Sequence, residues 1–180
     1  MSASANSAVI GELAQRHLDA GYNLGRWLLG NEHDAADAVH DAFLRALRST
    51  HTYAGGNARA WWLAIVRNCC LAKLGARGRD ALHGAAEVTL AAEAPATATD
   101  APEEQAEACQ RRTLLARSLR ALPIEFRETL VLREIEDLSY REIADVLGVP
   151  IGTVMSRLAR GRALLQRALA ATQKESSHGL

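Results

Sequence analysis

Apolar residues recur at helical spacing in several stretches of the chain, which predicts amphipathic helices. In the N-terminal half these stretches are residues 34–47 and 58–68. In the C-terminal half, a leucine pattern over 114–122 stops at Pro123, and a second apolar face follows over 124–134. The residues predicted to face the core are Val39, Phe43, Ala46, Leu47, Trp61, Ile65, Phe126, Leu130, Val131 and Ile135.

Two further helices joined by a tight turn are predicted towards the C-terminus. Ser139 and Glu142 have the spacing of a capping box, in which each side chain bonds a free backbone N–H at a helix start. Gly148 can adopt the left-handed conformation that ends this helix, and Pro150 suits the first turn of the next one. This arrangement is a helix-turn-helix. The second helix carries outward-facing polar residues: Thr153, Ser156, Arg157 and Arg160.

Composition supports an all-α fold. The chain has 180 residues, of which only 3 are Trp, 3 Tyr and 2 Phe, too few aromatics for a typical β-sandwich. No apolar run approaches the ~18 residues that a membrane span needs, and the first residues do not resemble a secretory signal. We therefore expect a cytoplasmic protein without membrane insertion. Its 3 cysteines are expected to be reduced thiols, a zinc site being the less favoured alternative.

The net charge of zero conceals an uneven distribution. Residues 1–90 carry 9 basic and 8 acidic residues, residues 91–109 carry 5 acidic residues and no basic one, and residues 110–180 carry 12 and 8. From Val146 to Lys174 there are five basic residues and no acid. A one-sign stretch of this length, on the second helix of a helix-turn-helix, favours contact with DNA in the major groove. An ordinary helical hairpin with a charged surface is the alternative.

A flexible acidic linker is predicted over residues 77–103. This stretch is rich in Ala, Gly, Thr, Pro and Glu and has almost no large apolar side chains. Such a segment buries too little surface to offset its ordering entropy. A short surface helix in its alanine-rich part is the alternative. The sequence thus predicts an all-α protein of two small helical domains joined by this linker.

The stretch LREIEDLSYREIADVLGVPIGTVMSRLARGRALL resembles region four of bacterial RNA polymerase sigma factors, in the extracytoplasmic-function (ECF) group. The resemblance implies that residues 104–174 form a domain that binds the upstream promoter element, followed by a tail over 175–180. It implies these DNA contacts: Arg133, Thr153, Met155, Ser156, Arg157 and Arg160. Arg160 shares the outward face with Ser156 and Thr153 and is expected to read bases, whereas Arg157 is expected to meet phosphate.

Residues 34–46 are similar to the D-A-x-D-x-x-Q-E-x-F-x-R-A pattern of region two in the same family. The resemblance implies a domain over 1–76 whose polar helix face docks on the clamp helices of the polymerase. The implied polymerase contacts are Asp37, His40, Asp41 and Arg45. His40 stands where Gln is common and Asp41 where Glu is common. Taken alone, a His beside an Asp could suggest a metal or acid–base site, but no convergent ligands accompany it.

Residues 58–68 are similar to the A-W-L-x-x-I-x-R-N signature of region two, which opens the downstream promoter element. Capture of an unstacked base needs a pocket or stacking surface to offset the cost of opening. The implied contacts with this DNA are Tyr53, Asn57, Arg59, Arg67, Asn68 and Lys73. The family usually continues with an Asp and a run of arginines, and this chain has a thinner basic tail.

The resemblance implies a sigma factor that binds core RNA polymerase and promoter DNA, directs DNA opening and initiation, and needs no cofactor or metal. An anti-sigma factor is an expected partner. A stand-alone helix-turn-helix regulator, or a response-regulator output domain, is the alternative, but it leaves the front half of the chain unexplained. An enzyme is disfavoured, because the chain has no phosphate-binding Gly loop, G-x-S-x-G, H-E-x-x-H or paired-Cys motif.

Overall fold

The elements of the computed structural model follow one another as two groups of helices. The structure describes residues 3–49, 52–53, 55–82 and 102–177, with side chains over 10–49, 52–53, 55–79 and 107–171. The N-terminal half comprises α1 (Ala3–Arg16), α2 (Leu18–Leu29), α3 (Glu32–Arg48) and α4 (Ala58–Leu82). The C-terminal half comprises α5 (Pro102–Ala121), α6 (Ile124–Leu130), the π-helical turn η2 (Val131–Ile135), α7 (Tyr140–Leu147) and α8 (Ile151–Ser177). All regular elements of the described residues are helical, which confirms the predicted fold class.

Side-chain caps set several of these helix boundaries. The Asn31 side chain accepts a hydrogen bond of 2.8 Å from the Asp34 N–H at the start of α3. The Asn57 Oδ1 accepts one of 3.0 Å from the Ala60 N–H at the start of α4. The capping box predicted at Ser139 is present, because its hydroxyl accepts from the Glu142 N–H and the Glu142 carboxylate accepts from the Ser139 N–H. These bonds satisfy backbone donors that have no partner within a helix.

The turn of the helix-turn-helix forms as the sequence predicts. Gly148 ends α7 at φ 66°, in the left-handed region that a glycine enters without strain. Pro150 lies just before α8 rather than in its first turn, and its carbonyl accepts from the Thr153 N–H at 2.9 Å. Val154 and Leu158 then face the core and are fully buried.

In the N-terminal half, α4 presents one continuous buried face to α2 and α3. The side chains on this face follow a spacing of four, three and one residues: Trp62, Val66, Cys69 and Cys70. Trp61 was predicted to lie in the core, but that prediction is wrong, since Trp61 is half-buried and Trp62 is fully buried. One residue along a helix is a rotation of about 100°, which turns Trp61 towards Tyr53, with ring centroids 5.2 Å apart.

In the C-terminal half, the second predicted helix widens into a π-helical turn. The Glu136 N–H bonds the Val131 carbonyl at 3.0 Å, five residues back. Val131 and Leu132, at the start of this wider turn, are both fully buried. Ile135, which the helical spacing predicts on the core face, is 39% exposed instead.

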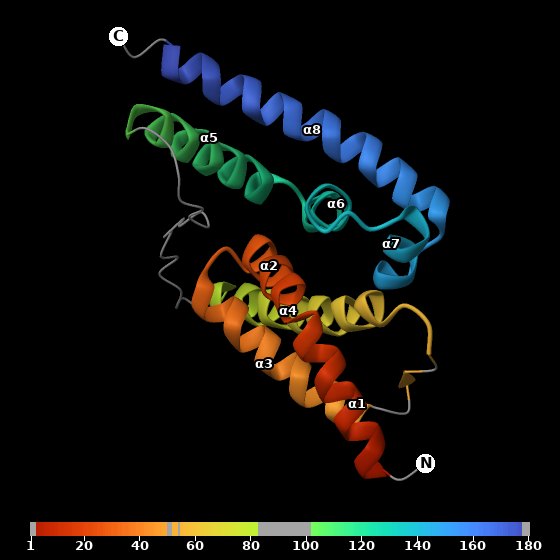
Figure 1. Cartoon of the computed structure of the whole chain (residues 1–180). Coiled ribbons are helices and arrows are strands. Elements are labelled where there is room, and N and C mark those ends of the chain that lie inside the picture. The colour runs from red at the N-terminus through yellow and green to blue at the C-terminus, as the bar shows by residue number, and fades with distance from the viewer. Residues whose placement is uncertain (1–2, 50–51, 54, 83–101, 178–180) are drawn as a thin grey trace.

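The two halves pack on each other. Figure 1 shows α1 to α4, coloured red to yellow, on one side and α5 to α8, green to blue, on the other. Helix α4 contacts α7, while α2 contacts α5, α6 and η2. The buried apolar side chains of both halves, apart from Ala35 and Ala116, belong to one continuous cluster. The stretch predicted to be a flexible linker, residues 77–103, is helical at both ends, because α4 runs to Leu82 and α5 begins at Pro102. Residues 83–101 lie outside the described residues.

No helix among the described residues combines the length and apolar character needed to cross a membrane.

Gly21 is the point of closest approach between α2 and α4. A Cβ at this position would lie 2.7 Å from Trp62 Nε1 and 3.1 Å from Val66 Cγ2. We expect Gly21→Ala to lower the free energy of unfolding by about 1–3 kcal/mol, because the buried indole cannot move aside freely. Gly11→Ala is the control, since no atom lies within 4 Å of its Cβ, and it should be neutral or stabilising by up to about 1 kcal/mol. Urea denaturation of the two variants checks the difference, and equal stabilities would contradict it.

The three cysteines should differ sharply in reactivity. Burial raises the pKa of Cys69 and raises that of Cys70 to about 12, so neither forms a thiolate readily near neutral pH. Cys109 is exposed on α5. We expect a thiol reagent at pH 8 to modify Cys109 rapidly in the native protein, and Cys69 and Cys70 only on unfolding. Rapid labelling that persists in Cys109→Ser would contradict this placement.

Candidate DNA and polymerase surfaces

The outward face of α8 holds most of the residues predicted to contact the upstream element. Met155 is 55% exposed, and Ser156 and Arg160 are exposed beside it. Thr153 is half-buried and its carbonyl accepts a hydrogen bond of 3.0 Å from the Ser156 hydroxyl. Thr153, Ser156 and Arg160 lie on one face at the start of α8, as the helical spacing predicts, while Met155, one residue before Ser156, is turned about 100° from it.

Arg157 points away from that surface. Its side chain is 25% exposed, and its Nη1 lies 3.5 Å from Glu128 Oε1 on α6. The offset from Arg160 that the sequence predicts is present, but the group that Arg157 meets in this structure is a buried carboxylate. Its predicted contact with phosphate stays a prediction.

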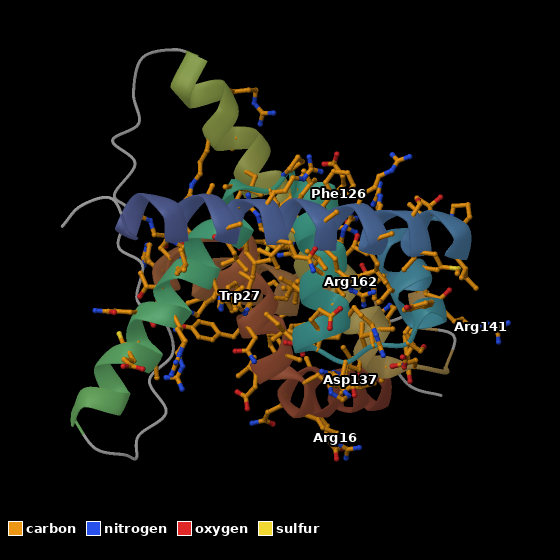
Figure 2. The ribbon with its side chains drawn as sticks, turned by 90° about the horizontal axis from the view of Figure 1, so that it is seen from above. Arg16, Trp27, Phe126, Asp137, Arg141 and Arg162 are labelled. Carbon is orange, nitrogen blue, oxygen red and sulfur yellow. The ribbon has the colours of Figure 1, made fainter. Side chains whose placement is uncertain are left out.

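Arg133 is held in place by its own half of the molecule. Its Nη1 donates to the Leu138 carbonyl at 2.8 Å and lies 3.4 Å from Asp137 Oδ1. Its guanidinium also lies over the Tyr140 ring, 5.6 Å from the centroid. These contacts fix Arg133 at the flank of the helix-turn-helix. In Figure 2, the side chain of Arg141 extends outward at the edge of the molecule.

Three of the six residues predicted to contact the downstream element face the C-terminal half. Arg67 donates two hydrogen bonds to the Glu128 carboxylate, from Nε at 2.7 Å and from Nη2 at 2.9 Å. Arg59 Nη2 donates to Glu136 Oε2 at 2.6 Å. The Asn57 side-chain amide donates to the Glu142 carboxylate.

The remaining downstream candidates lie apart from these three. The ring of Tyr53 contacts that of Trp61 in a tilted arrangement. The Tyr53 hydroxyl donates to the Gly56 carbonyl at 3.1 Å. Asn68 is exposed next to Arg67. Lys73 lies on the α3 side of α4, with its Nζ 3.7 Å from Asp37 and 3.9 Å from Asp41. The structure thus brings Lys73 to the predicted polymerase contacts and not to Arg59 or Arg67.

The predicted polymerase contacts form an exposed polar face on α3. Asp37 and Asp41 are each 51% exposed at the side chain, and His40 and Arg45 are exposed on the same helix. His40 also borders a shallow, largely apolar depression of about 310 Å³ between α2 and α3. Its lining residues are Leu18, Asp19, Tyr22, Ala36, Val39, His40 and Phe43. Across the part of the chain that the structure describes, no group of three His, Cys, Asp or Glu side chains converges as a metal site would require.

Sequence reasoning missed the acidic partners of these arginines. Glu128 and Glu136 are 2% and 4% exposed, which is unusual for carboxylates. Burial raises the pKa of Glu136, and hydrogen bonds from Arg59 and Asn23 oppose that rise. A signal for Glu128 was present in the sequence, because it lies four residues after Ile124 and three before Val131, on the apolar face of its helix. A carboxylate on such a face predicts a buried ion pair.

Comparison with known proteins agrees with this geometry. Residues 13–80 match the family model described as Sigma-70 region 2, and residues 112–165 match Sigma-70, region 4. The chain is 38% identical over 168 residues to the ECF RNA polymerase sigma factor SigE of Mycolicibacterium smegmatis, covering 92% of this chain and 63% of that protein. It is 34% identical over 137 residues to the ECF RNA polymerase sigma-E factor of Escherichia coli, covering 72% of this chain and 70% of that protein.

Among solved structures, the fold resembles the sigma factor RpoE of Bartonella quintana, crystallised with the anti-sigma factor NepR. The TM-score is 0.72 at 25% identity, and the match covers 87% of this chain and 93% of that one. Two helical regions in this order, the second with a helix-turn-helix, define the class of the sigma-70-type transcription factors. Within that class, the chain belongs to the ECF RNA polymerase sigma factors.

Proposed function

We propose that this protein binds core RNA polymerase and directs promoter recognition, DNA opening and transcription initiation. The observation that carries the proposal is the presence of both sigma regions on one chain, over residues 13–80 and 112–165. The exposed polar face of α3 supplies a surface for polymerase, and α4 and α8 supply residues for the two promoter elements. Such a factor acts without catalysing a reaction and without a cofactor, in the cytoplasm where polymerase and DNA are found.

We further propose that residues 1–76 and 104–174 serve as the polymerase-binding and upstream-binding domains, and that an anti-sigma factor binds the chain. The likeness to a sigma factor crystallised with its anti-sigma factor supports the latter. A stand-alone regulator would use the helix-turn-helix only and leaves the region 2 match without a role. Run-off transcription with core polymerase over a promoter library tests the proposal. Tight duplex binding without polymerase, together with no initiation, would favour the regulator instead.

Polymerase binding should depend on Asp41. We expect Asp41→Arg to weaken binding to core polymerase by roughly 2 kcal/mol or more, about thirtyfold, because it reverses a charge in a desolvated contact. The fold should persist, since Asp41 is half exposed and its pairing with Lys73 is a weak surface contact. Binding is measured by fluorescence titration. Glu12→Arg, on α1, is the charge-matched control and should bind as the wild type does. Unchanged affinity of a folded Asp41→Arg variant would refute this assignment.

Arg160 and Arg157 should contact different parts of the DNA, Arg160 the bases and Arg157 the phosphates. In holoenzyme bound to promoter DNA, we expect Arg160→Ala to cost roughly 1–3 kcal/mol at the preferred upstream element and to relax base preference there. Arg157→Ala should weaken binding to all DNA sequences alike and reduce the slope of log affinity against log salt concentration by about one unit. Binding to matched and mutated upstream elements at several salt concentrations separates the two effects. If Arg160→Ala weakens every sequence equally, Arg160 contacts phosphate and does not read bases.

A further inference from the structure

Arg133 lies in a segment of unusual backbone conformation. It belongs to the π-helical turn η2, and such wide turns are frequent at functional sites. Asp137, four residues later, has φ 48° and is the one residue other than glycine with a positive φ in the part of the chain that the structure describes. Aspartate tolerates this left-handed conformation better than most residues do. With the backbone in this shape, the Leu138 carbonyl accepts a hydrogen bond of 2.8 Å from Arg133 Nη1.

The hydrogen bonds of Arg133 leave one edge of its guanidinium available. Its bond to the Leu138 carbonyl and its 3.4 Å contact with Asp137 both involve Nη1. Among the described residues, no acceptor meets its Nε or Nη2, and the side chain is 34% exposed. In the same molecule, Arg67 uses Nε and Nη2 to hold the Glu128 carboxylate at 2.7 Å and 2.9 Å. Phosphate accepts the same two parallel bonds, so the Nε–Nη2 edge of Arg133 is suited to a phosphate.

Tyr140, the first residue of α7, contacts arginines from two other elements. The Arg133 guanidinium carbon lies 5.6 Å from the centroid of the Tyr140 ring, within the range of a cation–π contact. Hydrogen bonding to Glu134, and to a smaller extent to the Tyr140 hydroxyl, raises the pKa of Arg162 on α8. The Tyr140 ring is itself 36% exposed. Tyr140 therefore links Arg133, in η2, to Arg162, in α8.

Arg162 places this group beside the end of α8 that is predicted to contact DNA. It lies seven residues after Met155, about two turns along the helix, so both side chains lie on the same flank of α8. Met155 is 55% exposed and is one of the predicted contacts with the upstream element. A phosphate contact at this flank would fix the register of α8 in the groove without reading sequence.

We propose that Tyr140 is a positioning residue for upstream DNA: its ring, together with the Leu138 carbonyl, holds the Arg133 guanidinium so that the Nε–Nη2 edge binds a backbone phosphate beside the element. The inference rests on the proposed function, because it takes α8 to bind promoter DNA. Arginine is among the side chains that lose the most rotamer freedom when they are fixed. Because Tyr140 restricts Arg133 before DNA arrives, less of that freedom is lost on binding, and the affinity for DNA is higher.

A double-mutant cycle in holoenzyme tests this role, with binding measured to a promoter duplex selected by run-off transcription. Tyr140→Leu keeps an apolar side chain and removes the ring, and it should weaken binding roughly two- to fivefold, the range of an exposed cation–π contact. The loss should be equal for matched and mutated upstream elements, because phosphates carry no sequence information. In an Arg133→Ala background, Tyr140→Leu should change the affinity by less than about 1.5-fold, because the two residues act as a unit.

Tyr140→Phe is the matched control for this cycle. It keeps the ring over Arg133 and removes only the hydroxyl, so it should bind the promoter within about 1.5-fold of the wild type. A residue that only stabilises the fold would give the same loss with or without Arg133. If Tyr140→Leu weakens binding as much in the Arg133→Ala background as in the wild type, Tyr140 does not act through Arg133 and the proposal is wrong.

The motion of the Arg133 side chain in the free full-length chain is a second measurement, independent of DNA. The Arg133 Nε–H resonance is assigned by its disappearance in Arg133→Ala. Its heteronuclear NOE should be that of a rigid group in the wild type and in Tyr140→Phe. In Tyr140→Leu it should fall towards the value of Arg111, whose side chain on α5 is 72% exposed. An Arg133 side chain that is equally mobile in all three proteins would overturn the proposal.

Run-off transcription with core polymerase keeps this inference distinct from the proposed function. A wild-type chain that supports no initiation at any promoter refutes the proposed function itself. A wild-type chain that initiates, with Tyr140→Leu equally harmful in the presence and absence of Arg133, refutes only the positioning role of Tyr140.

Discussion

The ion pair between Arg67 and Glu128 is the contact on which the packing of the two halves of this protein depends. Both groups are largely buried, and taking two charges out of water costs several kcal/mol per ion unless their hydrogen bonds are good. The bidentate geometry at 2.7 Å and 2.9 Å supplies those bonds. The pair therefore constrains how the two halves meet, since another register would leave the buried Glu128 carboxylate with only the more distant Arg157, at 3.5 Å.

Other polar contacts between the halves follow the same pattern. Arg127, on α6, donates to the Leu28 carbonyl at 3.1 Å at the end of α2, and to the Arg120 and Leu122 carbonyls of its own half. Burial lowers the pKa of Arg127, and the nearby positive charge of Arg120 lowers it further. Apolar packing brings the halves together, and each buried charge then fixes where they meet. Sequence-distant charges thus determine an arrangement that periodic apolar patterns leave open.

The sequence predicts local structure well and the interface poorly, for a physical reason. The capping box at Ser139 and the glycine turn at Gly148 depend on residues a few positions apart, so both can be read from spacing. Trp61 and Ile135 were misplaced because each depends on helix register, which a neighbouring helix or a π-helical turn decides. The partners of Arg59 and Arg67 are separated from them by 77 and 61 positions in the chain. No local pattern encodes such a pairing, although an acid at position 128 on an apolar helix face predicts that a partner exists.

The two candidate surfaces of the N-terminal half differ in whether the packing of the two halves leaves them exposed. Asp37 and Asp41 are half exposed on α3, which packs on α1, α2 and α4, whereas Arg59 and Arg67 lie against the C-terminal half. On the proposed function, the α3 face is therefore accessible to core polymerase while the two halves are packed on each other. The chain has no net charge and a sequence pI near 7.0, so no net positive charge draws it to DNA, and attraction to a promoter must come from local groups of basic residues.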